Sequence, residues 1–270
     1  MEIIAELGKN WIYTEDELSV EENLERAKEL VVAAKEAGAD VVKFQTHADD
    51  EYSKRSPARR EWIDRNIRGT PYNEFWTPLK RFCDDLGIEF LTTPMSRKAA
   101  QMMNPLVKRW KVSSADIVDT GLLKYLKSTN KPVILSSGMS TEEQIEKAVR
   151  MFSGPTLLHC VSIYPCPEEL AQLGTIPYLK RKFPHIRIGY SDHTTSTIVP
   201  AMATVLGACL IEKHFTLSTD SFGPDHLTSM TPGEFKEMVK MVKDAQIYYG
   251  KEEKVLLDKE KSLWQNFRNG

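Results

Sequence analysis

Two lysines lie in apolar segments that are expected to be buried. Lys43 and Lys111 each lie inside a short run of apolar residues. Because a buried, unpaired ammonium group is costly, each lysine needs an anionic partner. That partner is either a nearby carboxylate, with Glu6 and Asp116 as the candidates, or the carboxylate or phosphate of a ligand. The lysines therefore predict an internal ion-pair network or an anion-binding site.

Hydroxyl-bearing residues follow the same kind of apolar run. Thr93, Ser114 and Ser136 would supply hydrogen-bond donors around one anion, although Ser and Thr at such places also serve as helix N-caps. The pair Ser137-Gly138 would let the backbone approach a ligand closely. This surplus of donors, added to two cations, favours a ligand that carries both a carboxylate and a phosphate.

Two histidines suggest a metal site. His193 and His214 follow neighbouring apolar segments, and two neutral imidazoles completed by oxygen ligands or water suit Mn²⁺ or Zn²⁺. Two histidines are too few for a closed structural zinc site, and an open position would let the metal polarise a carbonyl oxygen. Alternatively, one histidine is a base and the other its hydrogen-bond partner. Asp225 is a further polar candidate, whereas the adjacent His226 is expected to be incidental.

These residues follow eight short, apolar, β-branched segments that alternate with longer amphipathic ones. The apolar character is nearly continuous, as expected for parallel strands covered on both faces. Polar residues follow each segment at once, and the carboxyl ends of parallel strands share one rim, so an active site is predicted there. The predicted strands are Glu2–Leu7, Ala39–Gln45, Ile88–Thr93, Arg109–Ser113, Pro132–Ser137, Thr156–Val161, Ile186–Tyr190 and Cys209–His214.

Helix start and stop signals frame the segments between the strands. The clearest predicted helices are Glu21–Ala37, Tyr72–Leu86, Thr141–Phe152 and Thr231–Tyr249. Repeated strand–helix units over residues 1–250 predict a single-domain (βα)8 barrel, with a doubly wound parallel sheet as the alternative. The charged segment Asp49–Thr70 is expected to form a long loop over the active face. Residues 251–270 are expected to be a tail that packs on the barrel.

The composition is ordinary for a globular protein. The chain has 270 residues, 41% hydrophobic and 27% charged, and 36 basic against 38 acidic residues give a formal net charge of −2. This balance argues against a nucleic-acid partner. No signal peptide or membrane span is recognisable, so a cytoplasmic protein without a membrane partner is expected. The cysteines are expected to be reduced, with a Cys160–Cys166 bridge as the extracellular alternative; the four are Cys83, Cys160, Cys166 and Cys209.

A series of motifs runs in order through nearly all of residues 1–248. They are Val42-Lys43-Phe44-Gln45-Thr46, Trp110-Lys111-Val112-Ser113-Ser114, Leu135-Ser136-Ser137-Gly138-Met139, Leu158-His159-Cys160, Ile163-Tyr164-Pro165, Gly189-Tyr190-Ser191-Asp192-His193-Thr194, Glu212-Lys213-His214-Phe215-Thr216, and Gly223-Pro224-Asp225 with Ser229-Met230. In this series the chain resembles the N-acetylneuraminate (sialic acid) synthase family. The motifs that contain His193 and His214 are together its most specific part.

The resemblance implies a (βα)8 barrel that condenses phosphoenolpyruvate with an aldehyde sugar, N-acetylmannosamine or a relative, in surface-polysaccharide biosynthesis. The products would be a 2-keto-3-deoxy, nonulosonic-type sugar acid and phosphate. It implies a divalent metal on His193 and His214, first Mn²⁺, with Mg²⁺, Co²⁺ or Zn²⁺ as alternatives. It implies that phosphoenolpyruvate is held by Lys43, Thr93, Lys111, Ser114, Ser136, Ser162 and Ser191. Catalytic positions around the metal, the water and the acceptor would be Glu6, Gln45, Asp116, Tyr164 and Asp225.

The chain departs from the family pattern on the phosphoenolpyruvate side. Ser162 stands where these synthases usually have Asn, beside the phosphate, and Ser114-Ala115-Asp116 replaces the usual Ser-Gly-Glu. Family members usually also carry a C-terminal antifreeze-like domain, which is not expected in this chain. A separately encoded partner domain and a homo-oligomer therefore both stay open.

The acceptor side matches the family less well, in residues 53–72. The arginines of this segment would form either a cationic pocket for a phosphorylated or carboxylated sugar or a solvated helix face; they are Arg59, Arg60, Arg65 and Arg68. Two alternative functions follow. One is a synthase of the 3-deoxy-octulosonate-phosphate type with a phosphosugar acceptor, and the other is a non-catalytic barrel that binds a sugar acid.

Overall fold

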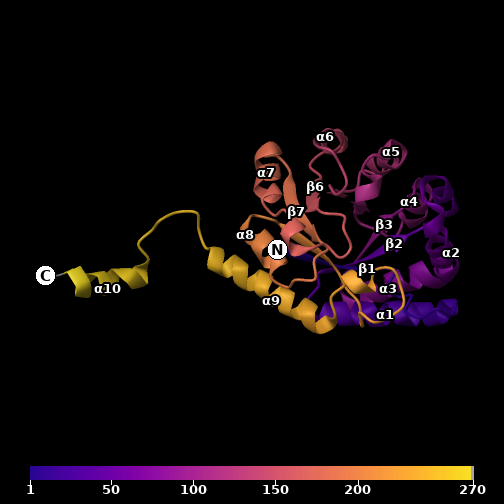
Figure 1. The fold of residues 1–270 in the computed structure, drawn as a ribbon, viewed down its shortest axis with the longest axis horizontal. Helices are drawn as coiled ribbons and strands as arrows, with labels where there is room; N and C mark the ends of the chain where they lie inside the picture. Colours follow the sequence, from indigo (N-terminus) through magenta and orange to yellow (C-terminus); the bar gives the residue numbers. More distant parts are fainter. Residues whose placement is uncertain (269–270) are drawn as a thin grey trace.

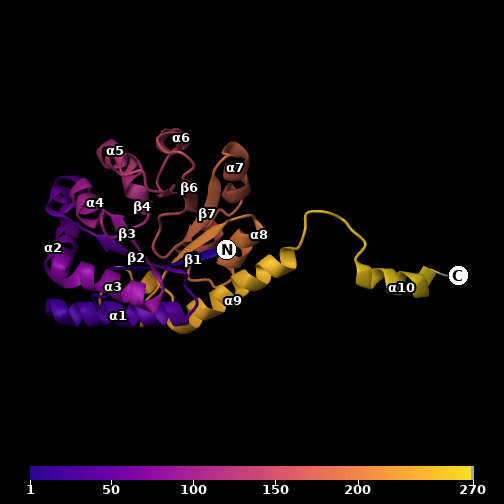
Figure 2. The same ribbon diagram turned by 180° about the vertical axis from the view of Figure 1, so that it is seen from behind.

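Eight parallel strands form one sheet that curls into a nearly closed barrel (Figures 1 and 2). The computed structural model describes residues 1–268, without the side chains of residues 52–54, 58, 262, 265, 266 and 268. The strand order is β3-β2-β1-β8-β7-β6-β5-β4, and the end strands β3 and β4 lie beside each other. The strands are β1 (Glu2–Gly8), β2 (Val41–Thr46), β3 (Glu89–Pro94), β4 (Trp110–Val112), β5 (Val133–Ser136), β6 (Thr156–Cys160), β7 (Arg187–Asp192) and β8 (Leu210–His214).

The first and last strands pair with each other, Glu6 lying opposite His214. A doubly wound sheet would leave these strands apart, so the predicted (βα)8 barrel is confirmed. All eight predicted strands are present within a few residues of their expected bounds.

Helices surround the sheet (Figures 1 and 2). They are α1 (Val20–Glu36), α2 (Arg60–Gly69), α3 (Thr77–Leu86), α4 (Arg97–Met103), α5 (Thr120–Ser128), α6 (Glu142–Arg150), α7 (Thr175–Lys182), α8 (Val199–Val205), α9 (Pro232–Tyr249) and α10 (Asp258–Arg268). Shorter turns are η1 (Asp49–Lys54), η2 (Pro57–Arg59), η3 (Tyr72–Trp76), η4 (Ser114–Asp116), η5 (Glu168–Leu170) and η6 (His226–Thr228).

The four predicted helices are confirmed, and their ends follow local sequence signals. Thr141 and Gln144 form a capping box at the start of α6, which satisfies backbone N–H groups that have no partner within the helix. Gly87 ends α3 in the left-handed conformation with φ of 71°. The segment expected to begin a helix at Tyr72 starts with the π-helical turn η3 before α3.

The barrel interior is stacked in layers. Its middle layer is apolar and consists of Ile4, Val41, Leu91, Ile134, Leu158 and Leu210, one from each of six strands. Side chains alternate between the two faces of a strand, so the residue two positions further on each strand also points inward. Those residues are Glu6, Lys43, Thr93, Ser136, Cys160 and Glu212. An apolar floor therefore separates a polar upper layer from the lower end of the barrel.

The lower end is closed by an ion-pair cluster. Arg109, at the entrance to β4, binds the carboxylates of Glu2 and Glu89, with its Nε 2.8 Å from Glu89 Oε1. Because these partners come from β1 and β3, the cluster ties together strands on both sides of the unpaired β3–β4 seam.

The tail differs from its expected place. Residues 251–261 are exposed, and α10 lies apart from the barrel beyond an extended segment (Figures 1 and 2). The segment after Gly250 is rich in Lys and Glu, whose solvation opposes burial against the barrel. Among the described residues, no helix is long and apolar enough to cross a membrane. The four cysteines are free.

Candidate active site

A cavity of about 460 Å³ opens above the apolar floor, at the carboxyl ends of the strands. Every residue predicted to bind phosphoenolpyruvate lines it, as do His193 and His214 and four of the five predicted catalytic residues. These are Glu6, Lys43, Gln45, Thr93, Lys111, Ser114, Ser136, Ser162, Tyr164, Ser191, His193, His214 and Asp225. Asp116 is not among the lining residues.

The base of the cavity is a buried ionic network. Glu212 Oε1 lies 3.3 Å from Lys111 Nζ, and Glu212 Oε2 lies 3.6 Å from Lys43 Nζ. Lys43 also pairs with Glu6, whose other oxygen accepts a hydrogen bond from Gln45. The two lysines are therefore joined through one shared carboxylate. The sequence had offered Glu6 and Asp116 as partners and had not singled out Glu212.

Hydroxyl groups complete this network. Lys111 Nζ donates to Ser136 Oγ at 2.6 Å, and Lys43 Nζ donates to Thr93 Oγ1 at 3.1 Å. Ser191 Oγ donates to Glu212 Oε1 at 3.0 Å. The ammonium groups thus have short, directed contacts on several sides, which orients them toward one small volume.

Burial and charge oppose each other here. Burial alone would raise the pKa of Glu212, but the ammonium groups of Lys111 and Lys43 outweigh it and lower that pKa to about 2. Burial lowers the pKa of Lys111. Glu212 is therefore ionised at neutral pH and holds the positive charge of the lysines in an otherwise desolvated layer.

Side-chain alternation along β7 and β8, together with the register of the two strands, decides which residues of the two histidine motifs reach the cavity. Ser191 lies opposite Glu212 and Asp192 opposite Lys213. The first pair lines the cavity, whereas the second forms a fully buried ion pair outside it, with Lys213 Nζ 2.6 Å from Asp192 Oδ2. His193 and His214, two positions beyond the first pair, also line the cavity.

The two histidine rings lie side by side, with centroids 5.5 Å apart, and the Tyr164 ring lies 4.1 Å from that of His193. His193 Nδ1 lies 2.7 Å from the carbonyl oxygen of Val161, so Nδ1 carries a proton, and in the neutral ring Nε2 has the lone pair that a metal requires. His214 Nδ1 is buried and, among the described residues, has no hydrogen-bond partner.

This donor set fits a divalent ion with open positions. Within residues 1–268, no group of three or more His, Cys, Asp or Glu side chains is arranged to hold a metal by itself. An ion on His193 and His214 would need its remaining ligands from water or substrate oxygen atoms, which suits a catalytic rather than a structural site.

Gly138 allows three polar side chains to converge. A Cβ atom at this position would lie 2.2 Å from Ser162 Oγ, 2.7 Å from Ser114 Oγ and 3.1 Å from Cys160 Sγ. Ser162 departs from the family pattern, and Ser114 directly precedes the departure at Ala115-Asp116. These two serines approach each other only because residue 138 has no side chain.

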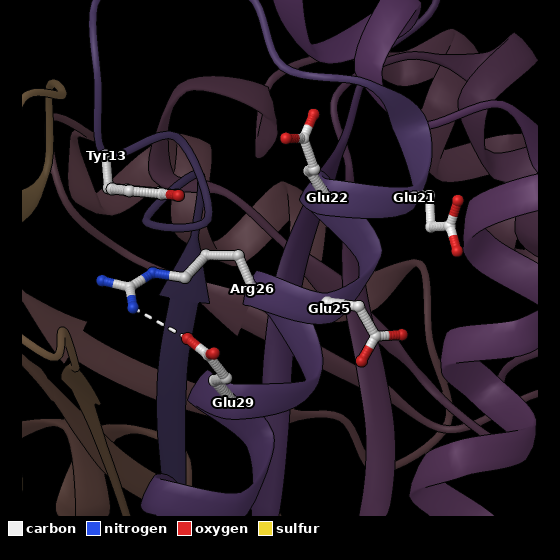
Figure 3. Close-up of a pocket in the computed structure, with 6 residues that line it drawn as sticks. All are labelled: Tyr13, Glu21, Glu22, Glu25, Arg26 and Glu29. Atoms are coloured by element: carbon white, nitrogen blue, oxygen red, sulfur yellow. Dashed lines mark hydrogen bonds and ion pairs between the residues drawn. The ribbon is translucent and has the colours of Figure 1, made fainter.

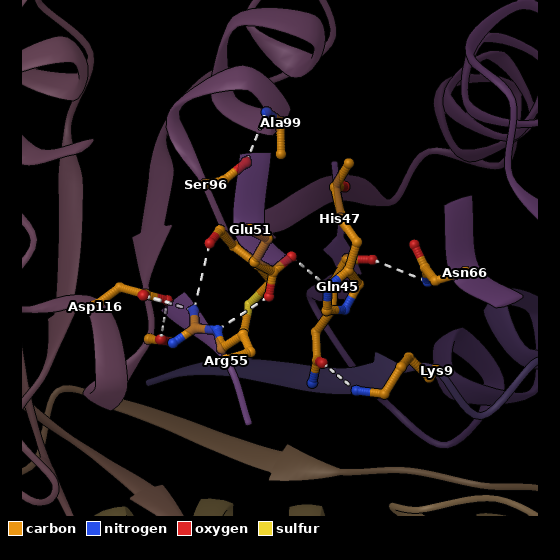
Figure 4. A network of polar contacts seen from close by, with 12 residues as sticks. Lys9, Gln45, His47, Glu51, Arg55, Asn66, Ser96, Ala99 and Asp116 are labelled. Carbon is orange, nitrogen blue, oxygen red and sulfur yellow. Dashed lines mark hydrogen bonds and ion pairs between the residues drawn. The ribbon is translucent and has the colours of Figure 1, made fainter. Parts of the chain in front are cut away.

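Asp116 has a different place from the one expected. It is buried, its Oδ1 is 2.6 Å from Arg55, and its Oδ2 accepts a hydrogen bond from Ser113 (Figure 4). Arg55 also donates to Glu51, which bonds His47. Arg55, which itself lines the cavity, forms an ion pair with Asp116.

Arg55, Glu51 and His47 line the cavity but were missed by sequence reasoning. One signal was available, since positions 47, 51 and 55 are spaced four apart. Such spacing brings side chains together in a helical turn, and η1 covers the middle of this stretch. Lys9 was also missed; it pairs with Asp225 at 3.4 Å. It also donates to Gln45, two residues before His47 (Figure 4).

The arginines of the segment Asp49–Thr70 lie in different places. Arg59 lines the cavity. Arg65 donates to backbone carbonyl groups of Thr14 and Glu15, and Arg68 pairs with Glu17 at the surface. Arg60 is exposed. The segment does border the active face as predicted, but in helical turns, and Trp62 and Ile63 are among its other cavity residues.

A second depression lies on the N-terminal part of α1, bordered by Tyr13, Arg26 and four glutamates (Figure 3). Arg26 pairs with Glu29 at 2.8 Å. Solvated carboxylates on one helix face form no catalytic constellation, so the chemistry is assigned to the barrel cavity.

Comparison with known proteins places the chain in a family. The model of the NeuB family matches residues 30–254. The chain belongs to the NeuB family. The prediction of an enzyme of this family, which rested on the motifs around Lys43, Lys111, His193 and His214, is confirmed.

Named NeuB relatives are sugar-acid synthases. The N,N'-diacetyllegionaminic acid synthase of Legionella pneumophila is 36% identical over 96% of this chain and 76% of that protein. The pseudaminic acid synthase of Helicobacter pylori is 35% identical over 93% of this chain and 76% of that protein. The solved N-acetylneuraminic acid synthetase of Leptospira borgpetersenii, in complex with citrate, superposes with a TM-score of 0.86 at 30% identity, covering 98% of this chain and 91% of that one.

Proposed function

We propose that this NeuB-family barrel condenses phosphoenolpyruvate with an aldehyde sugar to give a 2-keto-3-deoxy sugar acid and phosphate, in the biosynthesis of surface polysaccharide. The observation that carries the proposal is the buried lysine pair, Lys43 and Lys111, joined through Glu212 and ringed by hydroxyl groups beside two histidines. Phosphoenolpyruvate carries a carboxylate and a phosphate, which match these cations and donors.

His193 and His214 would hold a divalent ion, with Mn²⁺ as our first choice. When bound there, such an ion would supply Lewis-acid polarisation of the carbonyl oxygen of the acceptor. The lysines and hydroxyl groups hold phosphoenolpyruvate so that its C3 faces that carbonyl carbon. The apolar floor excludes water from below, which strengthens each contact to the anion.

The reaction forms one carbon–carbon bond and breaks one carbon–oxygen bond. C3 of phosphoenolpyruvate attacks the aldehyde carbon, whose oxygen takes a proton. Water adds to C2 and gives a proton to Glu6, whose pKa is raised by burial, as suits a proton acceptor in a site near neutral pH. The C2–oxygen bond to phosphate then breaks, the second proton of the water passes to the phosphate, and the phosphate departs toward Lys43 and Lys111. The proton received by Glu6 balances the one that the aldehyde oxygen took.

The test follows the loss of phosphoenolpyruvate by ultraviolet absorbance. Purified protein is assayed with Mn²⁺ or with EDTA against N-acetylated, free and phosphorylated aldoses. We expect metal-dependent loss with one acceptor class. Loss that EDTA does not abolish would contradict the metal assignment. No loss with any aldose, together with no binding of phosphoenolpyruvate, would contradict the synthase and favour a barrel without turnover.

Lysine variants test the anion site directly. Lys43→Met and Lys111→Met should each raise the KM for phosphoenolpyruvate about 10- to 100-fold, because each removes a charge-assisted contact. Lys131→Met is the matched control, since Lys131 binds backbone carbonyl groups of Asn104 and Val107 outside the cavity. An unchanged KM in both cavity variants would overturn the anion-site assignment.

A further inference from the structure

His47 has a buried ring nitrogen that the hydrogen-bond network of Glu51 and Arg55 does not satisfy. The residue follows β2 directly and lines the outer wall of the cavity. Its Nδ1 lies 2.7 Å from Glu51 Oε2, whereas its Nε2 is buried and has no hydrogen-bond partner among the described residues. A buried polar atom without a partner is costly and calls for an explanation.

The hydrogen-bond network determines what Nε2 can do. Glu51 accepts from both sides, from His47 at one oxygen and from Arg55 Nε, 3.0 Å away, at the other. A carboxylate accepts hydrogen bonds only, so the proton of His47 lies on Nδ1. Burial lowers the pKa of His47, which keeps the imidazole neutral. Nε2 therefore carries a lone pair and can only accept a hydrogen bond.

The imidazole is held in place from behind. Arg55 is fixed by Asp116 at 2.6 Å, and Asp116 by Ser113 (Figure 4). The η1 turn that carries Glu51 is tied to α4, because Lys98 binds Asp49 at 2.7 Å. The contacts of Glu51, Arg55 and Asp116 thus fix the orientation in which the lone pair of His47 is presented.

Only one of the two proposed substrates can donate a hydrogen bond to His47 Nε2. Phosphoenolpyruvate offers acceptor oxygen atoms to its surroundings, so it satisfies the lysines but not a second acceptor. A sugar offers hydroxyl hydrogens and, where acylated, an amide N–H. The wall beside His47 also presents Trp62, Ile63 and Met95, which suit the carbon face of a sugar.

We propose that His47 is a specificity-determining residue of the acceptor subsite, and that its Nε2 accepts a hydrogen bond from a hydroxyl or amide N–H group of the acceptor sugar. Glu51 and Arg55 are positioning residues that fix the tautomer and the orientation of the ring. This inference rests on the proposed function and names the wall of the cavity at which the sugar is read.

The experiment compares the wild-type protein with His47→Phe and His47→Gln. The probe is N-acetylmannosamine with its monodeoxy analogues, or the aldose of the panel that is consumed fastest, at saturating phosphoenolpyruvate. His47→Phe should raise the acceptor KM about 10-fold or more and leave the KM for phosphoenolpyruvate within about twofold. His47→Gln, whose side-chain oxygen can accept a hydrogen bond, should recover part of the loss.

One deoxy analogue lacks the group that donates to His47. With the wild-type protein, its KM should exceed that of the full sugar by the same factor by which His47→Phe raises the KM of the full sugar. With His47→Phe, the KM values of this analogue and of the full sugar should be equal. His159→Phe is the matched control, because His159 is a buried histidine whose Nε2 binds Ala171 outside the cavity. Its acceptor KM should be unchanged.

Calorimetric titration with phosphoenolpyruvate distinguishes failure of this inference from failure of the proposed function. If phosphoenolpyruvate binds with normal affinity and the acceptor KM of His47→Phe is unchanged, this inference alone is overturned. The same holds if the wild-type protein binds phosphoenolpyruvate normally but accepts no aldose. A wild-type protein that does not bind phosphoenolpyruvate would overturn the proposed function and, with it, this assignment.

Discussion

At the scale of single residues, the site depends on which side chains are absent as much as on which are present. Gly138 lies where Ser114, Ser162 and Cys160 approach one another, and any Cβ atom there would overlap Ser162 Oγ. The phosphate end of the proposed anion site is therefore shaped by one missing methyl group.

Gly138→Ala should lower kcat/KM for phosphoenolpyruvate about 10-fold or more, because the added methyl group forces the two serine hydroxyls out of their common volume. The assay is the ultraviolet measurement of phosphoenolpyruvate loss, with the fold checked by circular dichroism. Gly174→Ala is the control, since nothing lies within 4 Å of a Cβ atom there. Equal losses in the two variants would show that the effect is not specific to the site.

At the scale of elements, the barrel separates chemistry from stability. The upper layer contains the ionic network around Glu212, and the lower end contains the cluster around Arg109, with the apolar floor between them. In such barrels catalytic groups gather at the carboxyl ends of the strands, and the opposite end contributes to stability.

Arg109→Met should therefore destabilise the protein without changing catalysis. We expect the free energy of unfolding to fall by about 2 kcal/mol, between the values for exposed and buried ion pairs, since the pairs with Glu2 and Glu89 are partly buried. Urea denaturation measures this loss. The KM for phosphoenolpyruvate should remain that of the wild type, and a large change in it would contradict the separation of the two ends.

At the scale of the whole molecule, burial leaves several histidines neutral. Burial lowers the pKa of His47, His159 and His226 from the ordinary value of 6.5. Hydrogen bonds with Thr216 and Ile12 fill both ring nitrogens of His226, which agrees with the expectation that this residue is incidental to the chemistry.

The contribution of these three histidines to stability should consequently fall as the pH is lowered below 6.5. In that range the unfolded chain binds protons that these buried imidazoles do not bind in the folded protein. Each such histidine costs up to about 1.4 kcal/mol per pH unit until its folded pKa is reached. Urea midpoints at pH 7.5 and 5.5 in EDTA test this, and His159→Phe should show the smaller decrease. A midpoint that rises toward pH 5.5 would contradict the prediction.

Much of the fold and of the site could be predicted from the sequence because the relevant signals are local. The apolar strands, the capping box at Thr141 and the glycine stop at Gly87 each depend on residues a few positions apart. The polar residues at the strand ends were also local signals, and strand alternation sends Lys43 and Lys111 into the cavity.

Pairings between distant segments could not be predicted in this way. Asp116 was expected among the catalytic residues, but its position depends on Arg55, which is 61 residues away in the sequence. Glu212 was not singled out as the shared partner of Lys43 and Lys111, because those lysines lie on β2 and β4, far from β8 in the sequence. The tail after Gly250 lies apart from the barrel, since local helix signals do not specify what a helix packs against.

The sequence by itself thus determined the barrel, its family and many of the side chains that meet at its upper rim, because periodicity, caps and motifs are local features of the chain. The tertiary structure decided which carboxylate each cation neutralises and which buried atom, His47 Nε2, is left for a substrate. The physical reason is that charge neutralisation and hydrogen-bond saturation are summed over all neighbours in space, and those neighbours come from many strands at once.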